Sequence, residues 1–396
     1  MTTPSQPIQT DKSLRQQQVY LDHAAATPLR PEVAMAITEA QRLGFANPSS
    51  QHAAGRAGRR LLEEARERIL ALVGGRGGRA TGDRDRLVFT SGASEANQLA
   101  LLGMAIAQPA TGTILYSARD HASALQAVAA VGRRGWHIQE LGLDATGCSV
   151  SAPAAEQAGP RILSLTLVCG QTGAVQPLCL AGAAGSETLI HIDATQAAGL
   201  LPIAVHALGA ATLALAPHKF GGPRGIGGLV IRGGIAVAPV QAGSQEEGLR
   251  GGTESVALAA GFAKAMELAA ADREQESLRI TELRDRFEGR LLEVCRAAGI
   301  LAVVVAAAAR RSPHISTVAF PGRDRQALAM AADLAGVCLA TGTACASGSS
   351  EPAPALVAMQ LPREFVRGAV RCSFGRTTTV ADVDLAVDRL AGLLRR

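Results

Sequence analysis

Aromatic side chains and long apolar stretches are both scarce in this chain. Aromatic residues make up 3% of its 396 residues, with a single Trp and two Tyr. Smaller side chains must therefore fill the core, which suits helices packed closely on a parallel sheet. No apolar run reaches the roughly eighteen residues that cross a bilayer, and the polar, Gln-rich leader over residues 1–18 lacks an apolar signal core. We therefore expect a disordered leader, a cytoplasmic location and no membrane contact.

Charge of one sign does not dominate either. The 39 basic and 34 acidic residues give a net charge of +5, and the arginines are dispersed among Asp and Glu. Without a basic stripe interleaved with aromatics, nucleic acid is not an expected partner. The seven cysteines show no CxxC spacing and no paired framework. We therefore expect free thiols in a reducing compartment, and no metal site.

Apolar runs alternate with helical patterns from about residue 60 to residue 260, which predicts a mainly parallel sheet with helices on both faces. The strand candidates are Leu87–Thr90, Thr113–Tyr116, His137–Leu141, Arg161–Val168, Glu187–Ile192, Thr212–Ala216 and Gly228–Ile231. This fold class is α/β, with the sheet forming a large domain.

A second, smaller α+β domain is expected to follow. An ordinary Ala-rich helix is predicted over Ser255–Ala271, and a charged helix over Ala271–Ala298 marks the change of domain. Further elements of the small domain are expected at Ala302–Ala308, Ile315–Phe320 and, as a closing helix, Leu385–Leu394. We place the large domain at 19–262, with its first residues able to pack against the small one, and the small domain at 263–396.

Lysine is also rare: the chain has only three, Lys12, Lys219 and Lys264. Lys12 lies in the leader and Lys264 in the Ala-rich helical pattern. Lys219 instead follows an apolar run and enters the glycine turn Pro217–Gly222. An amine at the end of a buried strand can hold a carbonyl cofactor covalently, and burial would lower its pKa and make it nucleophilic. A surface lysine in a turn is the alternative.

An acidic partner lies upstream. Asp193 follows the apolar pair Leu189–Ile190, so it is expected at the C-terminal end of a strand, where open α/β sheets bind ligands. A carboxylate there can hold a proton on a pyridine nitrogen while Lys219 binds the same ring. These two roles are the protein's share of pyridoxal 5'-phosphate (PLP) chemistry.

A phosphate cradle is predicted after the strand Leu87–Thr90. Ser91-Gly92-Ala93-Ser94 follows that strand and precedes an apolar helix over Gln98–Ile106. The backbone N–H groups of Ala93 and Ser94, with the Ser94 hydroxyl, would face an anion from a helix N-terminus. The same pattern is also typical of a plain helix N-cap.

One cysteine lies in a loop of small residues, Gly342–Pro352. Such a segment cannot pack a core, so Cys345 is expected to be accessible, and accessible thiols near cations are the reactive ones. An incidental loop cysteine is the alternative. Buried, inert thiols are expected at Cys169, Cys179, Cys338 and Cys372, whereas Cys295 falls on a helix and Cys148 in a polar turn.

Together these motifs resemble the group I (NifS/IscS-like) cysteine desulfurases, PLP enzymes of the class V aminotransferase family. The resemblance runs in register over residues 19–394. The matching segments are Tyr20–Pro28, Asn47–His52, Thr90–Asn97, Asp120-His121, Asp193 with Gln196, His218-Lys219, Gln245–Thr253, Cys345 and Arg371. Any one of these motifs would be a weak signal, but their common order is a strong one.

The resemblance implies a PLP-dependent transferase of fold type I that takes sulfur from L-cysteine and passes it to an acceptor protein. It implies that Lys219 binds the cofactor covalently and moves the α-proton, that His121 stacks on the ring, and that Cys345 forms the persulfide. The implied PLP ligands are Ala93, Ser94, His121, Asp193, Gln196, His218, Lys219 and Thr253. Arg371 and Asn47 would bind the substrate carboxylate. Thr253 would reach the phosphate of the other subunit of a homodimer.

Two residues depart from the family pattern. Gly170 stands where the family usually has an asparagine near the ring oxygen, and Ala216 stands where it usually has a phosphate-binding serine. A hydrogen bond to a charged group is worth roughly 1.5–3 kcal/mol, so each loss weakens cofactor binding by about ten- to a hundred-fold. A desulfurase-like scaffold that has lost catalysis and a cystine or selenocysteine lyase are therefore alternatives. Structural roles are alternatives for Arg371 (an ion pair) and for His121 and Thr253 (helix caps).

Overall fold

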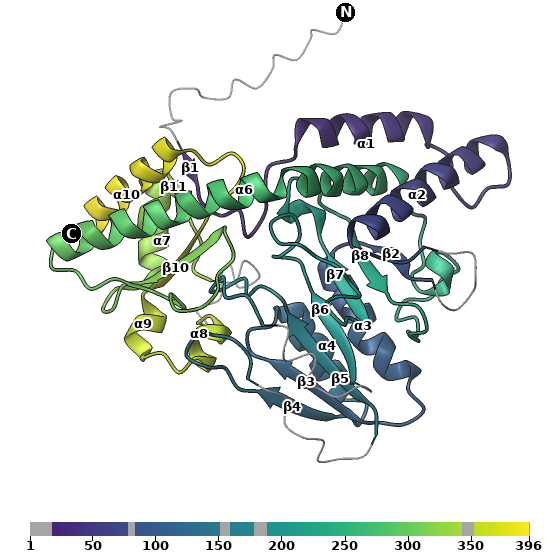
Figure 1. Ribbon diagram of the computed structural model, residues 1–396, viewed down its shortest axis with the longest axis horizontal. Coiled ribbons are helices and arrows are strands. Elements are labelled where there is room, and N and C mark those ends of the chain that lie inside the picture. Colours follow the sequence, from purple (N-terminus) through teal and green to yellow (C-terminus); the bar gives the residue numbers. More distant parts are fainter. Residues whose placement is uncertain (1–17, 78–83, 151–158, 178–187, 343–351, 396) are drawn as a thin grey trace, which may run out of the picture.

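The computed structural model describes residues 18–77, 84–150, 159–177, 188–342 and 352–395 (Figure 1). Cys345 and Cys179 fall outside these residues, as does the expected leader apart from residue 18. The fold is reported for the described residues only.

A seven-stranded sheet forms the centre of the larger part of the molecule. Its strands in spatial order are β2 (Arg86–Thr90), β8 (Gly227–Ile231), β7 (Thr212–Leu215), β6 (Thr188–Asp193), β5 (Arg161–Thr166), β3 (Thr113–Ser117) and β4 (His137–Leu141). Strand β8 runs antiparallel to both neighbours, and the remaining pairs are parallel. The mainly parallel sheet and the seven strand positions predicted from the sequence are confirmed to within a few residues.

Helices cover both faces of this sheet, because alternate strand residues are apolar on both sides. Leu87 and Phe89 pack in a core with residues of α2 (Ala53–Leu72) and α6 (Val256–Ala297). Val88, between them, packs in the opposite core with α3 (Ala93–Ala107) and α4 (Ala122–Gly132). Helix α1 (Pro31–Leu43) lies beside α2 and α6 (Figure 1).

The smaller part is built on an antiparallel sheet ordered β12 (Ala369–Ser373), β10 (Ile315–Ala319) and β9 (Val303–Val304). Strand β1 (Val19–Tyr20) pairs in parallel with β11 (Val337–Cys338). The helices here are α7 (Arg325–Leu334), α8 (Pro354–Ala358), α9 (Arg363–Arg367) and α10 (Val380–Leu394). Val19 and Leu21 belong to this part's core, so the first described residues pack with the C-terminal part of the chain.

Two predicted elements have different lengths in the structure. The strand expected over Ala302–Ala308 covers only Val303–Val304, because Ala306 adopts φ 56°, which an extended strand does not allow. The closing helix begins at Val380, since Thr379 and Asp382 form a capping box that starts it earlier than its apolar pattern suggests.

Helix α6 connects the two parts, and it corrects the prediction of two separate helices (Figure 1). It is continuous over 42 residues and begins at a Ser255 cap. Phe262 packs in the core beneath the sheet, and Phe287, farther along, packs in the core of the smaller part. The division at residues 262 and 263 therefore falls inside one helix, and the two-domain division stays a proposal.

Candidate active site

A cavity of about 440 Å³ lies at the C-terminal ends of β5 and β6 and beside the turn that follows β2. Most of the residues expected from the sequence to bind the cofactor line it. They are Ala93, Ser94, His121, Asp193, Gln196, His218 and Lys219. Arg371, the expected substrate ligand, lines the same cavity although it comes from β12 of the smaller part. One site therefore joins residues from both parts.

Lys219 ends a short 3-10 turn, Pro217–Lys219, that follows β7. Its Nζ donates to the carbonyl oxygens of Ala24 at 2.7 Å and Ala25 at 2.9 Å. The amine thus points into the wall formed by the N-terminal segment, unlike a lysine in an open surface turn. Beside it, burial lowers the pKa of His218 to about 4, assisted by the positive charges of Lys219 and Arg224.

Asp193 is the last residue of β6 and is buried. Its Oδ2 accepts from Asn97 Nδ2 at 2.8 Å, and its Oδ1 accepts from the backbone N–H of Thr195 at 2.9 Å. Both oxygens of the Asp193 side chain therefore accept hydrogen bonds from the protein. The side chain is therefore placed to hold a proton on a ring nitrogen at this edge of the sheet.

The turn after β2 is open toward an anion. Gly92 is the N-cap of α3 and no side chain caps the helix, so the N-cap alternative for Ser94 is wrong: Ser94 lies in the first helical turn. The first N–H groups of a helix have no partner within it. A Cβ on Gly92 would meet nothing within 4 Å, whereas one on Gly227 would lie 2.5 Å from the Gly92 carbonyl carbon. Glycine at 227 thus lets β8 pack directly beneath the turn.

His121 both caps a helix and faces the cavity. It is the N-cap of α4, and its Nδ1 accepts from the backbone N–H of Ser123 at 3.2 Å. Burial lowers its pKa; Asp193 acts against this and Lys219 acts with it. The alternative role of His121 as a helix cap is therefore confirmed. The same imidazole ring also lines the cavity.

Arg371 is buried and already holds an ion pair. Its Nη2 lies 2.8 Å from Asp22 Oδ1, and its Nη1 donates to the Gly170 carbonyl at 2.8 Å. Its Nε is buried without a hydrogen-bond partner. The ion-pair alternative is thus confirmed as a contact, and one further donor direction of the guanidinium is unused.

Two of the expected site residues that the structure describes, Asn47 and Thr253, are not among those lining the cavity. Asn47 is exposed in the loop before α2, where its Oδ1 accepts from Ser49 N at 2.8 Å. Thr253 is also exposed, and the cap of α6 is Ser255, so the N-cap alternative for Thr253 is wrong. Cys345 lies outside the described residues.

Asn97 and Thr195 belong to the site, although no role was predicted for either from the sequence. Asn97 stood at the end of the predicted phosphate motif, and its helical position three residues after Ser94 could have indicated that it turns inward. Thr195 lines the cavity, with a buried hydroxyl that has no hydrogen-bond partner. No sequence signal distinguishes it from an ordinary turn residue.

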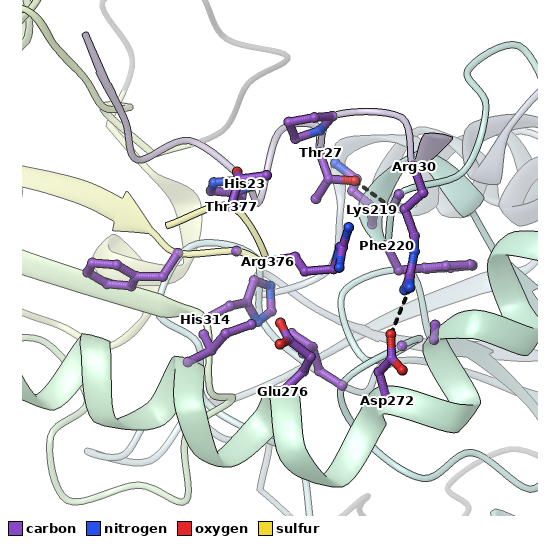
Figure 2. Close-up of a pocket in the computed structure, with 18 of the residues that line it drawn as sticks. His23, Thr27, Arg30, Lys219, Phe220, Asp272, Glu276, His314, Arg376 and Thr377 are labelled. Carbon is purple, nitrogen blue, oxygen red and sulfur yellow. Dashed lines mark hydrogen bonds and ion pairs between the residues drawn. The ribbon is translucent and has the colours of Figure 1, made fainter. Parts of the chain in front are cut away.

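A second cavity, of about 340 Å³, has Lys219 in its wall as well. Figure 2 shows it between the N-terminal segment and α6, with the Arg30–Asp272 ion pair at one side, 2.7 Å between Nη2 and Oδ2. His23 and His314 line it from the other side. Its walls include neither Asp193 nor the Gly92–Ser94 turn, so the chemistry belongs to the first cavity.

The described cysteines are free thiols in protected surroundings. Cys148, Cys169, Cys295 and Cys372 are buried, and Cys338 is half-buried. Cys148 was expected in a polar turn, but its side chain packs in a small apolar core, so that interpretation is corrected. Burial raises the pKa of Cys372 to about 12 and raises those of Cys295 and Cys338. These thiols are poor nucleophiles at neutral pH.

The donor set of the first cavity fits PLP. It offers an uncapped helix N-terminus for a phosphate, a buried carboxylate for a ring nitrogen and an amine for an aldehyde. Two buried hydroxyls in its wall, those of Thr166 and Thr195, lack hydrogen-bond partners. Among the described residues, no group of three or more His, Cys, Asp or Glu is arranged to hold a metal ion. Within the same residues, no helix has the length and apolar character needed to cross a bilayer.

Comparison with known proteins gives matches along nearly the whole chain. A model of the Aminotransferase class-V family matches residues 19–386. Cysteine desulfurase IscS of Dictyoglomus turgidum is 34% identical over 389 residues, which cover 96% of this chain and 95% of the relative. The IscS-like cysteine desulfurase of Mycobacterium tuberculosis is 35% identical, over 95% and 96% of the two chains.

Solved structures give the same fold. A NifS-like protein matches with a TM-score of 0.83 at 24% identity, over 95% of this chain and 99% of its own. DndA from Streptomyces lividans matches with a TM-score of 0.69 at 29% identity, over 89% and 99% of the two chains. The predicted fold class, a PLP-dependent transferase of fold type I, is confirmed, and with it the predicted cofactor, PLP. The chain belongs to the class V aminotransferase family.

Proposed function

We propose that this protein is a PLP-dependent cysteine desulfurase, which converts L-cysteine to L-alanine and leaves the sulfur on its own thiol as a persulfide. The observation that carries the proposal is the single cavity in which Lys219, Asp193, His121 and Arg371 converge. The named relatives, which are cysteine desulfurases at 34% and 35% identity, support the same activity.

Substrate binding depends on Arg371. The guanidinium is buried, its Nε has no hydrogen-bond partner among the described residues, and Asp22 accepts from Nη2. The substrate carboxylate would therefore share the guanidinium with Asp22 or displace it. The Gly170 carbonyl accepts from Nη1, so this contact and the one to Asp22 fix the plane of the guanidinium at the cavity wall, and this orients the amino acid.

Proton movement falls to Lys219 and His121. PLP, when bound, supplies the electron sink that stabilises negative charge on the substrate's α-carbon. Lys219 Nζ would hold the cofactor at its aldehyde, and the free amine of Lys219 would take the α-proton of the substrate. His121, neutral because burial lowers its pKa, is able to accept or return a proton as a general acid–base. Asp193 holds the proton on the ring nitrogen.

Sulfur transfer falls to Cys345. Its thiolate would attack the substrate sulfur; the carbon–sulfur bond breaks, and its electron pair remains with the carbon, which a proton then completes to alanine. The products are L-alanine and a Cys345 persulfide, so atoms and electrons balance without an added oxidant. The described cysteines, all buried or half-buried, are poor candidates for this step.

A homodimer, an acceptor protein and a cytoplasmic location complete the proposal. The segments that carry Asn47 and Thr253 are neighbours at the surface, because Pro48, Ser49 and Glu254 line one cavity of about 340 Å³. Thr253 is exposed and does not line the cavity of its own chain, which supports a pairing in which it reaches the phosphate of the second subunit. The free state of the described cysteines supports a reducing compartment. A sulfur-acceptor protein that acts in iron–sulfur cluster assembly would receive the outer sulfur atom of the persulfide.

The test is an assay with L-cysteine and a thiol reductant that measures sulfide and alanine together. Equal yields of the two products, abolished in Cys345→Ala, are expected. A protein that gives neither product with added PLP is a scaffold, which contradicts the proposal. Activity that survives Cys345→Ala contradicts the persulfide step and indicates a lyase.

A further inference from the structure

Behind the cavity wall, one buried amide connects Asp193 to His121. Asn97 is fully buried on α3. Its Nδ2 lies 2.8 Å from Asp193 Oδ2 and 3.0 Å from Ser123 Oγ. Its Oδ1 lies 3.0 Å from His191 Nε2. Asp193 and His121, which the proposed function places against the cofactor, are thus linked through Asn97 and Ser123.

The orientation of this amide follows from its partners. A carboxylate only accepts hydrogen bonds, so the Asn97 atom beside Asp193 is the NH₂ group. The Asn97 carbonyl then faces His191, whose Nε2 must carry the hydrogen. Nδ1 of His191 lies 2.9 Å from Thr212 Oγ1 and accepts from that hydroxyl. Burial lowers the pKa of His191 to about 4, with Asp193 acting in the opposite sense, so the ring is neutral and carries one N–H.

The donor-to-acceptor direction of these hydrogen bonds continues from Asn97 through Ser123 to His121. Because Asn97 donates to Ser123 Oγ, that hydroxyl directs its own hydrogen to His121 Nδ1, 2.8 Å away. The backbone N–H of Ser123 donates to the same nitrogen. Two donors on Nδ1 stabilise the neutral ring and hold its proton on Nε2. The charged groups that act on this ring are Asp193, which favours its protonation, and Lys219, which opposes it.

We propose that Asn97 is a positioning residue for the reaction: one amide donates both to Asp193 and to Ser123, and so keeps Asp193 an anionic acceptor and His121 a neutral ring. His191 anchors the amide in that orientation. The inference rests on the proposed function, since an anionic Asp193 is needed at the ring nitrogen and a neutral His121 is needed to accept a proton. It gives Asn97 a role and adds two residues, Ser123 and His191, to the site.

The test is histidine NMR on the full-length protein with and without bound PLP, using ¹⁵N-labelled imidazoles. Ser123→Ala removes the hydroxyl donor to His121, and Asn97→Leu removes the amide that orders it. In both variants the titration midpoint of His121 should rise by roughly half a unit to one unit. Asn97→Leu alone should also change the visible absorbance of bound PLP, because Asp193, the residue expected at the ring nitrogen, loses its donor. Ser316→Ala, a buried serine without a hydroxyl partner on β10, is the matched control.

An unchanged His121 midpoint in both variants, or an equal shift in Ser316→Ala, overturns the inference. If circular dichroism shows Asn97→Leu to be unfolded, the midpoint of Ser123→Ala decides alone. The NMR midpoints are readable whether or not L-cysteine is turned over. Failure of the proposed function is therefore distinguishable from failure of this assignment.

Discussion

Arg371 and Asp22 form an ion pair, 2.8 Å between Nη2 and Oδ1, at the point where the substrate carboxylate is expected to bind. They are separated by 349 residues in the sequence. Arg371 is buried and Asp22 is more accessible, with side-chain exposures of 3% and 23%. An anion that enters the site therefore meets a cation that already has a carboxylate partner.

Replacing the competing carboxylate should improve substrate binding. Asp22→Asn keeps a hydrogen-bond acceptor for Arg371 but removes the negative charge. We expect the KM for L-cysteine to fall by a few-fold, since a partly exposed pair is worth about 1 kcal/mol or less. Steady-state assays of sulfide release measure this change. A higher KM would mean that Asp22 mainly positions the guanidinium.

Arg371→Lys changes the cationic residue of the same ion pair. Lysine keeps the charge but lacks the planar set of donors that holds a carboxylate from two sides. We expect kcat/KM for L-cysteine to fall by about ten- to a hundred-fold, which corresponds to one charged hydrogen bond. A value within two-fold of the wild type would remove Arg371 from the substrate site.

Much of this site could be predicted from the sequence, because position within a strand determines it. Asp193 ends an apolar run, and Lys219 follows another by a few residues, so both were expected at the same edge of a parallel sheet. The turn around Gly92 was predictable for the same reason. In these cases a local pattern of apolar residues and glycine is sufficient.

Other features depend on contacts between distant segments and have no local signal. The pairing of Asp22 with Arg371 arises only when β12 is packed beside the N-terminal segment. The link from Asn97 to His191 crosses from α3 to β6. The continuity of α6 has no local signal, because its first half is apolar and its second half is charged, a pattern that resembles two helices. The structure explains the change of pattern: the two halves of one helix pack in two different cores.

Acid should destabilise the fold through three buried histidines. Burial lowers the pKa values of His23 and His191 to about 4 and that of His314 to about 3, from the ordinary histidine value of 6.5. Between those values the unfolded chain binds a proton at each site and the folded chain does not. Stability is therefore full above about pH 6.5 and falls as the pH drops toward 4. Each histidine contributes a slope of about 1.4 kcal/mol per pH unit.

Denaturant titrations between pH 7 and pH 4.5 measure this dependence. His314→Gln keeps a donor for Gln196, which now accepts from His314 Nε2 at 3.0 Å, but it does not titrate. We expect its free energy of unfolding to fall less steeply with acid than that of the wild type. An identical pH dependence would show that His314 is not neutral in the fold.

Gly227 should be intolerant of any side chain. Its Cβ would lie 2.5 Å from the Gly92 carbonyl carbon and 2.9 Å from the Ala93 nitrogen, so Gly227→Ala forces the phosphate turn away from β8. Overpacking of this kind costs about 1–3 kcal/mol. We expect a lower free energy of unfolding in urea and a weaker affinity for PLP, followed by visible absorbance.

Gly289 provides the control for that substitution. It lies exposed on α6, where a Cβ would meet nothing within 4 Å. Gly289→Ala should raise the free energy of unfolding by about 0.5–1 kcal/mol, because alanine loses less backbone entropy in a helix. PLP affinity should stay unchanged. Equal losses in the two variants would argue against a specific contact between β8 and the turn.

Gly170 offers a position at which cofactor binding can be strengthened. A Cβ there would lie 3.6 Å from Gln196 Nε2 and 3.7 Å from Gln196 Cγ, which are ordinary contacts, and the residue lines the cavity. Gly170→Asn therefore fits and adds an amide beside the expected ring oxygen. We expect PLP to bind about ten-fold more tightly, from one added hydrogen bond to a charged group of roughly 1.5 kcal/mol.

The gain at Gly170 should depend on the amide and not on volume. Gly170→Leu adds a side chain of similar size without donors, so it should narrow the cavity and weaken PLP binding. Equilibrium titration of PLP into each variant, read by visible absorbance, compares the two. Tighter PLP binding in both variants would mean that the added volume, and not the amide, strengthens binding. Weaker PLP binding in both would mean that residue 170 cannot carry a side chain without moving the Arg371 guanidinium, because the Gly170 carbonyl accepts from Arg371 Nη1.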